Sequence, residues 1–205
     1  MPNHIFINKK IKSFNKKIRV SSDKSISIRS VLLASQAVGI SKISNLLESE
    51  DVINALKTIK KLGINYTKKR GIYHIEGFGL NGFNIKKKIN INAGNSGTLA
   101  RLILGLLVKS KFKVRLIGDK SLSRRDFSRV IKPLRLFGVN IKSKNNKLPI
   151  EILGSDFLRP VTYYENIGSA QVKSCILLSA LNTPGTTIIK SKKSRNHTEL
   201  MLKFL

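Results

Sequence analysis

Three stretches of the chain share one hydrophobic pattern. Each opens with small or polar residues and runs into a helix-length segment that is apolar on nearly every side, beginning at Ser25, Ser96 and Ser169. These serines lie 71 and 73 residues apart. Self-similarity at a fixed period indicates a repeated structural unit, and a helix that is apolar all round belongs in the interior of a domain. The pattern therefore predicts three related units with buried first helices.

A second, amphipathic helix follows the first one in each unit. In the first two units Asp51 and Asp126 stand at the expected N-caps, and Gly63 and Gly138 stand where helices commonly end. Both pairs are 75 residues apart, which again indicates a repeat. Apolar residues recur at helical spacing between cap and glycine, so these helices are expected to cover the core and to face water on their other side.

Short stretches of β-branched and apolar residues predict the strands that connect these helices. The expected strands are residues 43–47, 64–69, 72–76, 113–117, 139–144, 148–153 and 186–190. The fold class is then α/β, with three pseudo-symmetric βαβαββ units around their buried first helices. The third unit stops at Leu205 in mid-helix, whereas the repeat places its terminating glycine near position ~213. We therefore expect this unit to be truncated and the sequence to be part of a longer polypeptide.

Charge and composition narrow the classes of function. The 205 residues carry 39 basic and 11 acidic side chains, a net charge of +28, which favours polyanions, acidic membranes or small multivalent anions as ligands. The longest apolar stretch, residues 99–108, is about half the ~20 residues that a membrane span needs. The first residues lack a secretory-signal pattern, so the expected location is the cytoplasm. One cysteine, Cys175, permits neither an intrachain disulfide nor a thiolate zinc site.

Each first helix begins at a cluster of hydrogen-bonding residues. A helix start offers unpaired backbone N–H groups and the positive end of the helix dipole, so three starts brought together by pseudo-threefold symmetry would bind a phosphate or carboxylate. Arg29 lies one helical turn after Ser25 and could add a forked donor for a carboxylate. The sequence therefore predicts an anion site where the three helices begin.

Structural roles compete with this interpretation. The three serines could be simple N-caps, and residues 95–98 an ordinary strand-to-helix turn. Arg29 needs an anion or another partner, because an unpaired buried guanidinium is costly. Arg101 could pair with an acidic side chain, and Lys173 could reach solvent along its alkyl chain.

The histidines and the cysteine give little support to a catalytic site. His4 and His74 have no companion residues at a useful spacing, and His197, at the entrance to the last helix, could be structural or functional. Cys175 lies on an apolar helix without a nearby base in the sequence, which predicts core packing.

Five motifs resemble, in their order along the chain, those of the EPSP synthase family, the 5-enolpyruvylshikimate-3-phosphate synthases. They are Lys24-Ser25-Ile26-Ser27-Ile28-Arg29 and residues 92–102, 118–125, 169–174 and 194–199. The resemblance covers about residue 18 onward and only about the first half of a family member. It implies the inside-out barrel of enolpyruvyl transferases, with two domains that close around the substrates. Residues 18–205 would be a three-repeat substrate-binding domain, incomplete at its C-terminus, and residues 1–17 would belong to a second domain.

The resemblance also implies an activity. The enolpyruvyl group of phosphoenolpyruvate would move to the 5-hydroxyl of shikimate 3-phosphate with loss of phosphate, without a metal or an organic cofactor. The expected partners are these small anions, with no specific nucleic acid and no membrane, and the complete protein is expected to be a monomer. The general acid and base are expected beyond Leu205, so this chain alone is expected to bind weakly and to be inactive.

Individual residues receive roles from the same resemblance. The implied contacts to shikimate 3-phosphate are Lys24, Ser25, Arg29, Ser169, Gln171, Ser194 and His197. The implied contacts to phosphoenolpyruvate are Lys24, Asn95, Gly97 and Arg125.

Two alternatives remain. The related UDP-N-acetylglucosamine enolpyruvyl transferases share the architecture but lack the pairing of Lys-Ser-x-Ser-x-Arg with Ser-Ala-Gln found here. A basic nucleic-acid-binding protein would account for the net charge of +28, although aromatic residues make up only 6% of the chain and no recognised motif interleaves them with lysines.

Overall fold

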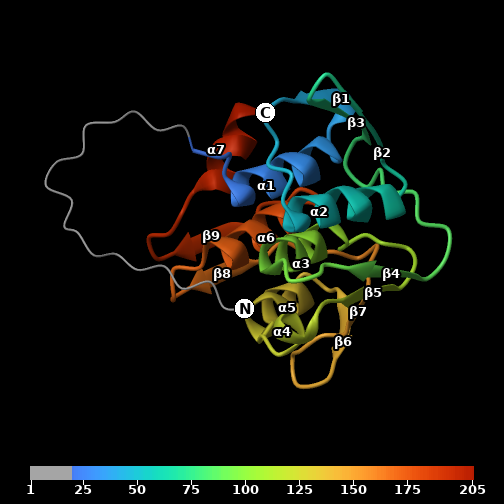
Figure 1. Ribbon diagram of the computed structural model, residues 1–205. Helices are drawn as coiled ribbons and strands as arrows, with labels where there is room; N and C mark the ends of the chain where they lie inside the picture. The colour runs from blue at the N-terminus through green and yellow to red at the C-terminus, as the bar shows by residue number, and fades with distance from the viewer. Residues whose placement is uncertain (1–19) are drawn as a thin grey trace, which may run out of the picture.

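The structure is a computed structural model that describes residues 20–205 (Figure 1). Its helices are α1 (Lys24–Ala34), α2 (Glu50–Lys61), α3 (Gly97–Leu106), α4 (Lys120–Ser123), α5 (Ser128–Leu136), α6 (Ala170–Ala180) and α7 (His197–Phe204). Its strands are β1 (Val38–Ile43), β2 (Asn65–Lys69), β3 (Ile72–Phe78), β4 (Ile89–Asn92), β5 (Val114–Ile117), β6 (Asn140–Ser143), β7 (Ile150–Leu153), β8 (Thr162–Glu165) and β9 (Ile188–Ser191).

The order of these elements confirms the predicted repeat. The second unit shows the pattern in full, from β4 and α3 through β5, α4 and α5 to β6 and β7. Within residues 20–205 the strands form three sheets, in the orders β1-β3-β2, β4-β5-β7-β6 and β8-β9. The pairs β4/β5 and β8/β9 are parallel, as strands joined by a crossover helix must be, whereas β1/β3, β2/β3, β5/β7 and β6/β7 are antiparallel.

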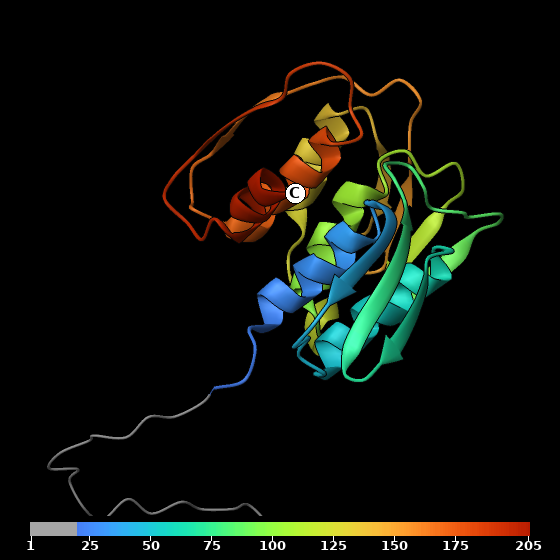
Figure 2. The same cartoon turned by 90° about the horizontal axis from the view of Figure 1, so that it is seen from above.

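The first helices of the units form the centre of the molecule, also as predicted. Figures 1 and 2 show α1, α3 and α6 side by side, with the sheets around them. Every residue of α3 except Arg101 is buried. Gly105 brings α3 close to α6, because a Cβ added there would lie 2.4 Å from the carbonyl oxygen of Cys175. The absent side chain at this position therefore sets the spacing of the two central helices.

The second helices end where the sequence indicates, but they begin differently. Gly63 and Gly138 follow α2 and α5 with φ of +90° and +97°, the left-handed conformation that glycine adopts without steric cost. The expected caps were wrong by one or two residues: Ser49 is the N-cap of α2, with Asp51 in the first turn, and Phe127 is that of α5. Asp126 precedes Phe127 and accepts a hydrogen bond from the backbone N–H of Ser128.

The strand expected at residues 43–47 was wrong, because the strand there, β1, ends at Ile43. β1 pairs with β3 from Val38 opposite Phe78 to Ile43 opposite Tyr73. Asn45 then takes a left-handed φ of 54°, which interrupts an extended strand. The other expected strands lie within about two residues of their predicted ends, whereas β4, β8 and α4 were not among the expected ranges.

Two further expectations concern the N-terminal segment and the membrane. The segment 1–17, assigned to a second domain, and His4 within it lie outside the described residues. Among residues 20–205, no helix combines the length and the apolar character needed to cross a membrane.

Candidate functional site

Side-chain hydrogen bonds join the first two turns of the three central helices. Gln171 in the first turn of α6 donates from Nε2 to Oγ1 of Thr98 in the first turn of α3, at 3.1 Å. Arg29 in the second turn of α1 donates from Nη2 to Oγ of Ser174 on α6, also at 3.1 Å. The three helices therefore begin at the same end of the bundle, as the anion-site prediction requires.

Arg29 connects α1 to both helices of the third unit. Only 4% of the residue is exposed. Its Nε donates to Oγ1 of Thr198 at 2.7 Å, its Nη1 to the carbonyl of Ser25 at 3.0 Å, and its Nη2 to Ser174. Burial and the nearby charge of Arg195 lower the pKa of this guanidinium. The charges of Asp23 and Glu199 act in the opposite direction on this pKa, but no carboxylate among residues 20–205 is hydrogen-bonded to the guanidinium.

Three of the residues expected to hold phosphoenolpyruvate, Asn95, Gly97 and Arg125, also lie together. Arg125 donates from Nη2 to Oδ1 of Asn95 at 2.7 Å. A Cβ added to Gly97 would lie 3.0 Å from Nη1 of Arg125 and 2.8 Å from Nη1 of Arg101. Because Gly97 carries no side chain, both guanidinium groups can approach the start of α3.

Lys24 lies at the start of α1, with its ammonium group 2.8 Å from a carboxylate oxygen of Asp51 on α2. About half of the Lys24 side chain is exposed. An ammonium group has three N–H donors, so the exposed side of Lys24 can bind an anion while the pair with Asp51 persists.

A polar cleft opens at the start of α6. It has a volume of about 540 Å³ and includes the predicted residues Ser169, Gln171 and Ser194. The hydroxyl oxygen of Ser194 is buried and has no hydrogen-bond partner among residues 20–205. His197 begins α7 and is not among the residues that line the cleft. The structure therefore brings three of the expected shikimate 3-phosphate ligands together in the cleft, whereas Lys24, Ser25, Arg29 and His197 are not among the residues that line it.

Two arginines line this cleft that sequence reasoning missed, Arg129 and Arg195. Arg195 directly follows Ser194 in a motif already singled out, so its position could have been noticed. Arg129 lies on α5, which belongs to another unit, and nothing in the local sequence points to the cleft. Both add donors for a phosphate or carboxylate.

The competing structural interpretations are partly right. Ser96 and Ser169 are N-caps, and the hydroxyl oxygen of each accepts a hydrogen bond from the backbone N–H three residues later. The N-cap of α1, by contrast, is Asp23, and Ser25 lies inside the helix. A capping serine still has its own O–H group to donate, so the cap role and a ligand role are compatible.

The environments expected for Arg101 and Lys173 were wrong. Arg101 pairs with no acidic side chain in residues 20–205: it donates to the carbonyls of Gly97 and Asp126 and stacks 4.7 Å from the Phe127 ring centre. Lys173 does not reach solvent freely, because it is 9% exposed and forms an ion pair with Glu199 on α7. Both side chains thus connect elements of the site.

Cys175 is a core residue, as predicted. It is fully buried, and burial raises the pKa of its thiol to about 12. A protonated, inaccessible thiol is a poor nucleophile. We expect no reaction with an aromatic disulfide reagent in the native chain and one thiol per chain in denaturant, measured by absorbance. Rapid stoichiometric labelling of the native chain would contradict this placement.

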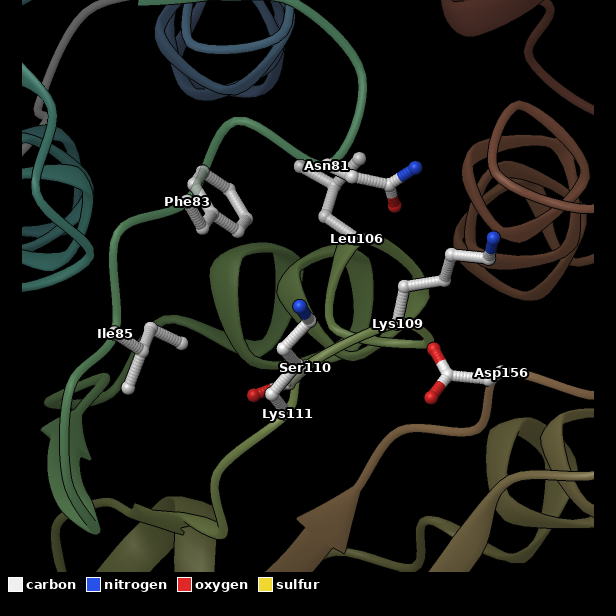
Figure 3. Close-up of a pocket in the computed structure, with 8 residues that line it drawn as sticks. All are labelled: Asn81, Phe83, Ile85, Leu106, Lys109, Ser110, Lys111 and Asp156. Atoms are coloured by element: carbon white, nitrogen blue, oxygen red, sulfur yellow. The ribbon is translucent and has the colours of Figure 1, made fainter.

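A second cavity lies at the other end of α3 (Figure 3). It measures about 220 Å³ and combines apolar side chains, among them Phe83, Ile85 and Leu106, with Lys109, Lys111 and Asp156. The C-terminal end of a helix carries the negative end of its dipole, which disfavours an anion. This cavity is therefore separate from the anion site at the helix starts.

The structure shows no metal-ligand cluster: within residues 20–205, no three or more His, Cys, Asp or Glu side chains are grouped so that they could hold a metal ion. Taken together, these observations define an α/β fold of repeated βαβαββ units, with basic and hydroxyl side chains gathered where its central helices begin. The sequence model of the family described as EPSP synthase (3-phosphoshikimate 1-carboxyvinyltransferase) matches residues 8–205. The chain belongs to the EPSP synthase family.

Individual relatives agree with this assignment. The chain is 46% identical over 189 residues to the 3-phosphoshikimate 1-carboxyvinyltransferase of Vesicomyosocius okutanii subsp. Calyptogena okutanii (strain HA), which covers 92% of this chain and 43% of that protein. It is 44% identical over 200 residues to the protein of the same name from Ruthia magnifica subsp. Calyptogena magnifica, covering 97% and 46%.

A solved structure of an EPSP synthase from Acinetobacter baumannii matches with a TM-score of 0.84 and 36% identity, covering 92% of this chain and 43% of that one. The chain therefore spans less than half the length of the curated relatives and of the solved structure that it matches.

Proposed function

We propose that this chain supplies the shikimate 3-phosphate-binding part of a carboxyvinyl-transfer site. In the reaction, the enolpyruvyl group of phosphoenolpyruvate moves to the 5-hydroxyl of shikimate 3-phosphate and phosphate leaves. The observation that carries the proposal is Arg29, a buried guanidinium without a hydrogen-bonded carboxylate among the described residues, located where α1, α6 and α7 meet. Family membership supports the choice of substrates.

The cleft residues fit a phosphorylated hydroxy acid. Ser169, Gln171, Ser194 and Arg195 offer hydroxyl, amide and guanidinium donors around one space, which suits the phosphate. Arg29 and Ser25, at the start of α1, would hold the carboxylate. His197 would contact the ring from the start of α7.

The neighbouring basic residues fit the second anion. Lys24, Asn95, Gly97 and Arg125 would bind phosphoenolpyruvate, with Gly97 leaving room for the ligand and for the Arg125 guanidinium. Two multiply charged anions repel each other unless positive groups offset their charges. Holding both in fixed positions also removes part of the entropic barrier to transfer.

The proposal retains four expectations as predictions. Residues 18–205 form a three-repeat substrate-binding domain, and residues 1–17 associate with a second domain. The cytoplasm is the location, and the complete protein is a monomer. Shikimate 3-phosphate and phosphoenolpyruvate, and no specific nucleic acid, are the partners.

Thermal unfolding with three ligands tests the proposal. We expect shikimate 3-phosphate to raise the melting temperature of the 205-residue chain, because a ligand that binds only the folded state stabilises it by about 2.7 kcal/mol at a concentration of 100 Kd. UDP-N-acetylglucosamine should have no effect, and duplex DNA should act only at low salt. Equal stabilisation by all three would show that net charge alone governs binding.

We also expect no release of phosphate from phosphoenolpyruvate by this chain, because its proposed site residues bind substrates and none of them is proposed as general acid or base.

A further inference from the structure

Glu165 is a buried acid at the edge of the cleft. It is the last residue of β8, only 4% of it is exposed, and it lies four residues before Ser169, the N-cap of α6. A buried carboxylate is costly unless hydrogen bonds satisfy its charge. Glu165 therefore needs hydrogen-bond donors, and the location of these donors indicates its role.

The carboxylate of Glu165 is bound by three consecutive backbone amides. The N–H groups of Gly168 and Ser169 donate to Oε2 at 2.6 and 2.8 Å, and that of Ile167 donates to Oε1 at 3.4 Å. Successive backbone N–H groups that converge in this way form an anion-binding concavity, a nest. Here the occupant of the nest is a side chain of the chain itself.

A fourth donor ties this nest to another repeat unit. Nη2 of Arg129, on α5, lies 2.9 Å from Oε1 of Glu165. Burial alone would raise the pKa of Glu165, but the hydrogen bonds from Ser169, Arg129 and Gly168 outweigh it and hold the pKa below its usual range. The carboxylate is thus ionised at neutral pH. Its pairing holds the Arg129 side chain at the wall of the cleft.

The loop between Glu165 and α6 packs closely against the segment that precedes α7. Gly168 has a φ of +81°, and a Cβ added there would lie 2.9 Å from the carbonyl oxygen of Lys193. The backbone of Glu165 also accepts a hydrogen bond from the N–H of Lys192 at 3.0 Å. The backbone of this loop therefore lies against the segment that carries Ser194 and Arg195, and the carboxylate of Glu165 fixes the amides that lead from the loop into α6.

We infer that Glu165 is a positioning residue of the anion site: it fills the amide nest ahead of α6, so that a ligand phosphate is bound by the side chains of the cleft and not by the nest. This inference rests on the proposed function. It has a consequence that a merely structural role lacks. Removing the carboxylate should weaken binding of shikimate 3-phosphate, since Ser169 and Gln171 lose their fixed position, while the vacated nest beside Arg129 becomes a place for inorganic phosphate.

Calorimetric titrations of three chains test this inference. We expect Glu165→Ala to bind shikimate 3-phosphate about tenfold more weakly than the unchanged chain, as for loss of one hydrogen bond that involves a charged group. Inorganic phosphate should bind Glu165→Ala more tightly than the unchanged chain. The matched control is Glu151→Gln on β7. This change removes one negative charge, which pairs with Lys88 and Lys113 near the surface, and it should change neither affinity.

Amide hydrogen exchange without any ligand gives an independent readout. The N–H groups of Gly168 and Ser169 should exchange slowly in the unchanged chain and in Glu151→Gln, and quickly in Glu165→Ala. Glu165→Gln, which keeps an acceptor oxygen, should restore protection in part and serves if Glu165→Ala does not fold. Unchanged protection in the Glu165 variants, or a parallel fall of both ligand affinities, would overturn the inference. Failure of the unchanged chain to bind shikimate 3-phosphate, with the exchange pattern as expected, would instead contradict the proposed function.

Discussion

Replacement of Gly105 by alanine is expected to lower the free energy of unfolding by roughly 2–3 kcal/mol. Helix propensity alone predicts the opposite sign, because alanine stabilises a helix interior by about 1 kcal/mol relative to glycine. The new methyl group, however, would lie 2.4 Å from the carbonyl oxygen of Cys175, a backbone atom of α6 that cannot move independently of its helix. The two central helices would have to separate.

Chemical denaturation monitored by circular dichroism measures this effect. Lys57→Ala, on the exposed face of α2, is a control that should change stability by no more than about 0.5 kcal/mol. A Gly105→Ala chain that is as stable as the unchanged chain, or more stable, would show that α3 and α6 are not in the close contact described.

Replacement of Gly97, the other glycine of α3, should affect binding instead of stability. Its Cβ would lie 2.8 Å from Nη1 of Arg101 and 3.0 Å from Nη1 of Arg125, and both atoms are the ends of flexible side chains that can move. We expect Gly97→Ala to fold with a melting temperature close to that of the unchanged chain. Because Arg125 would be displaced, affinity for phosphoenolpyruvate in the presence of shikimate 3-phosphate should fall about tenfold to a hundredfold.

Fluorescence or calorimetric titration of both alanine variants measures this difference. Gly105→Ala, where it remains folded at low temperature, should retain its affinity for phosphoenolpyruvate, whereas Gly97→Ala should lose it. If Gly97→Ala binds phosphoenolpyruvate as the unchanged chain does, Arg125 and the start of α3 are not part of the site.

The repeat was predictable because burial imposes a pattern that the chain itself carries. A helix surrounded by other elements must be apolar on all sides, so α1, α3 and α6 are visible in the sequence as three similar segments. The glycines after α2 and α5 were predictable for a related reason, since the left-handed conformation at a helix end favours glycine.

Details that depend on tertiary partners were not predictable. Ser49 and Asp51 are both suitable caps, and the sequence alone does not select between them; in the structure Asp51 pairs with Lys24. Two hydrogen-bond partners of Arg29, Ser174 and Thr198, lie 145 and 169 residues away, so the sequence could indicate that a partner is required but not which one.

The candidate site was predicted in outline and missed in part. Ser169, Gln171 and Ser194 were recognisable because they stand in motifs at the starts of helices. Arg129 and Glu165 stand in no such motif, and their pairing across two units exists only in the folded chain. A pair of this kind shapes the site through a contact between two units, and the local sequence carries no signal for that role.

The central claim is that the starts of α1, α3 and α6 form one anion site. Titration of the ¹⁵N-labelled chain with shikimate 3-phosphate, followed by NMR, tests it most directly. We expect the backbone amides at the three helix starts, represented by Ser25, Thr98 and Gln171, to shift together with a single dissociation constant, while the amides around the cavity at Leu106 and Lys109 stay unchanged. Shifts confined to surface lysines, or different dissociation constants at the three helix starts, would contradict the claim.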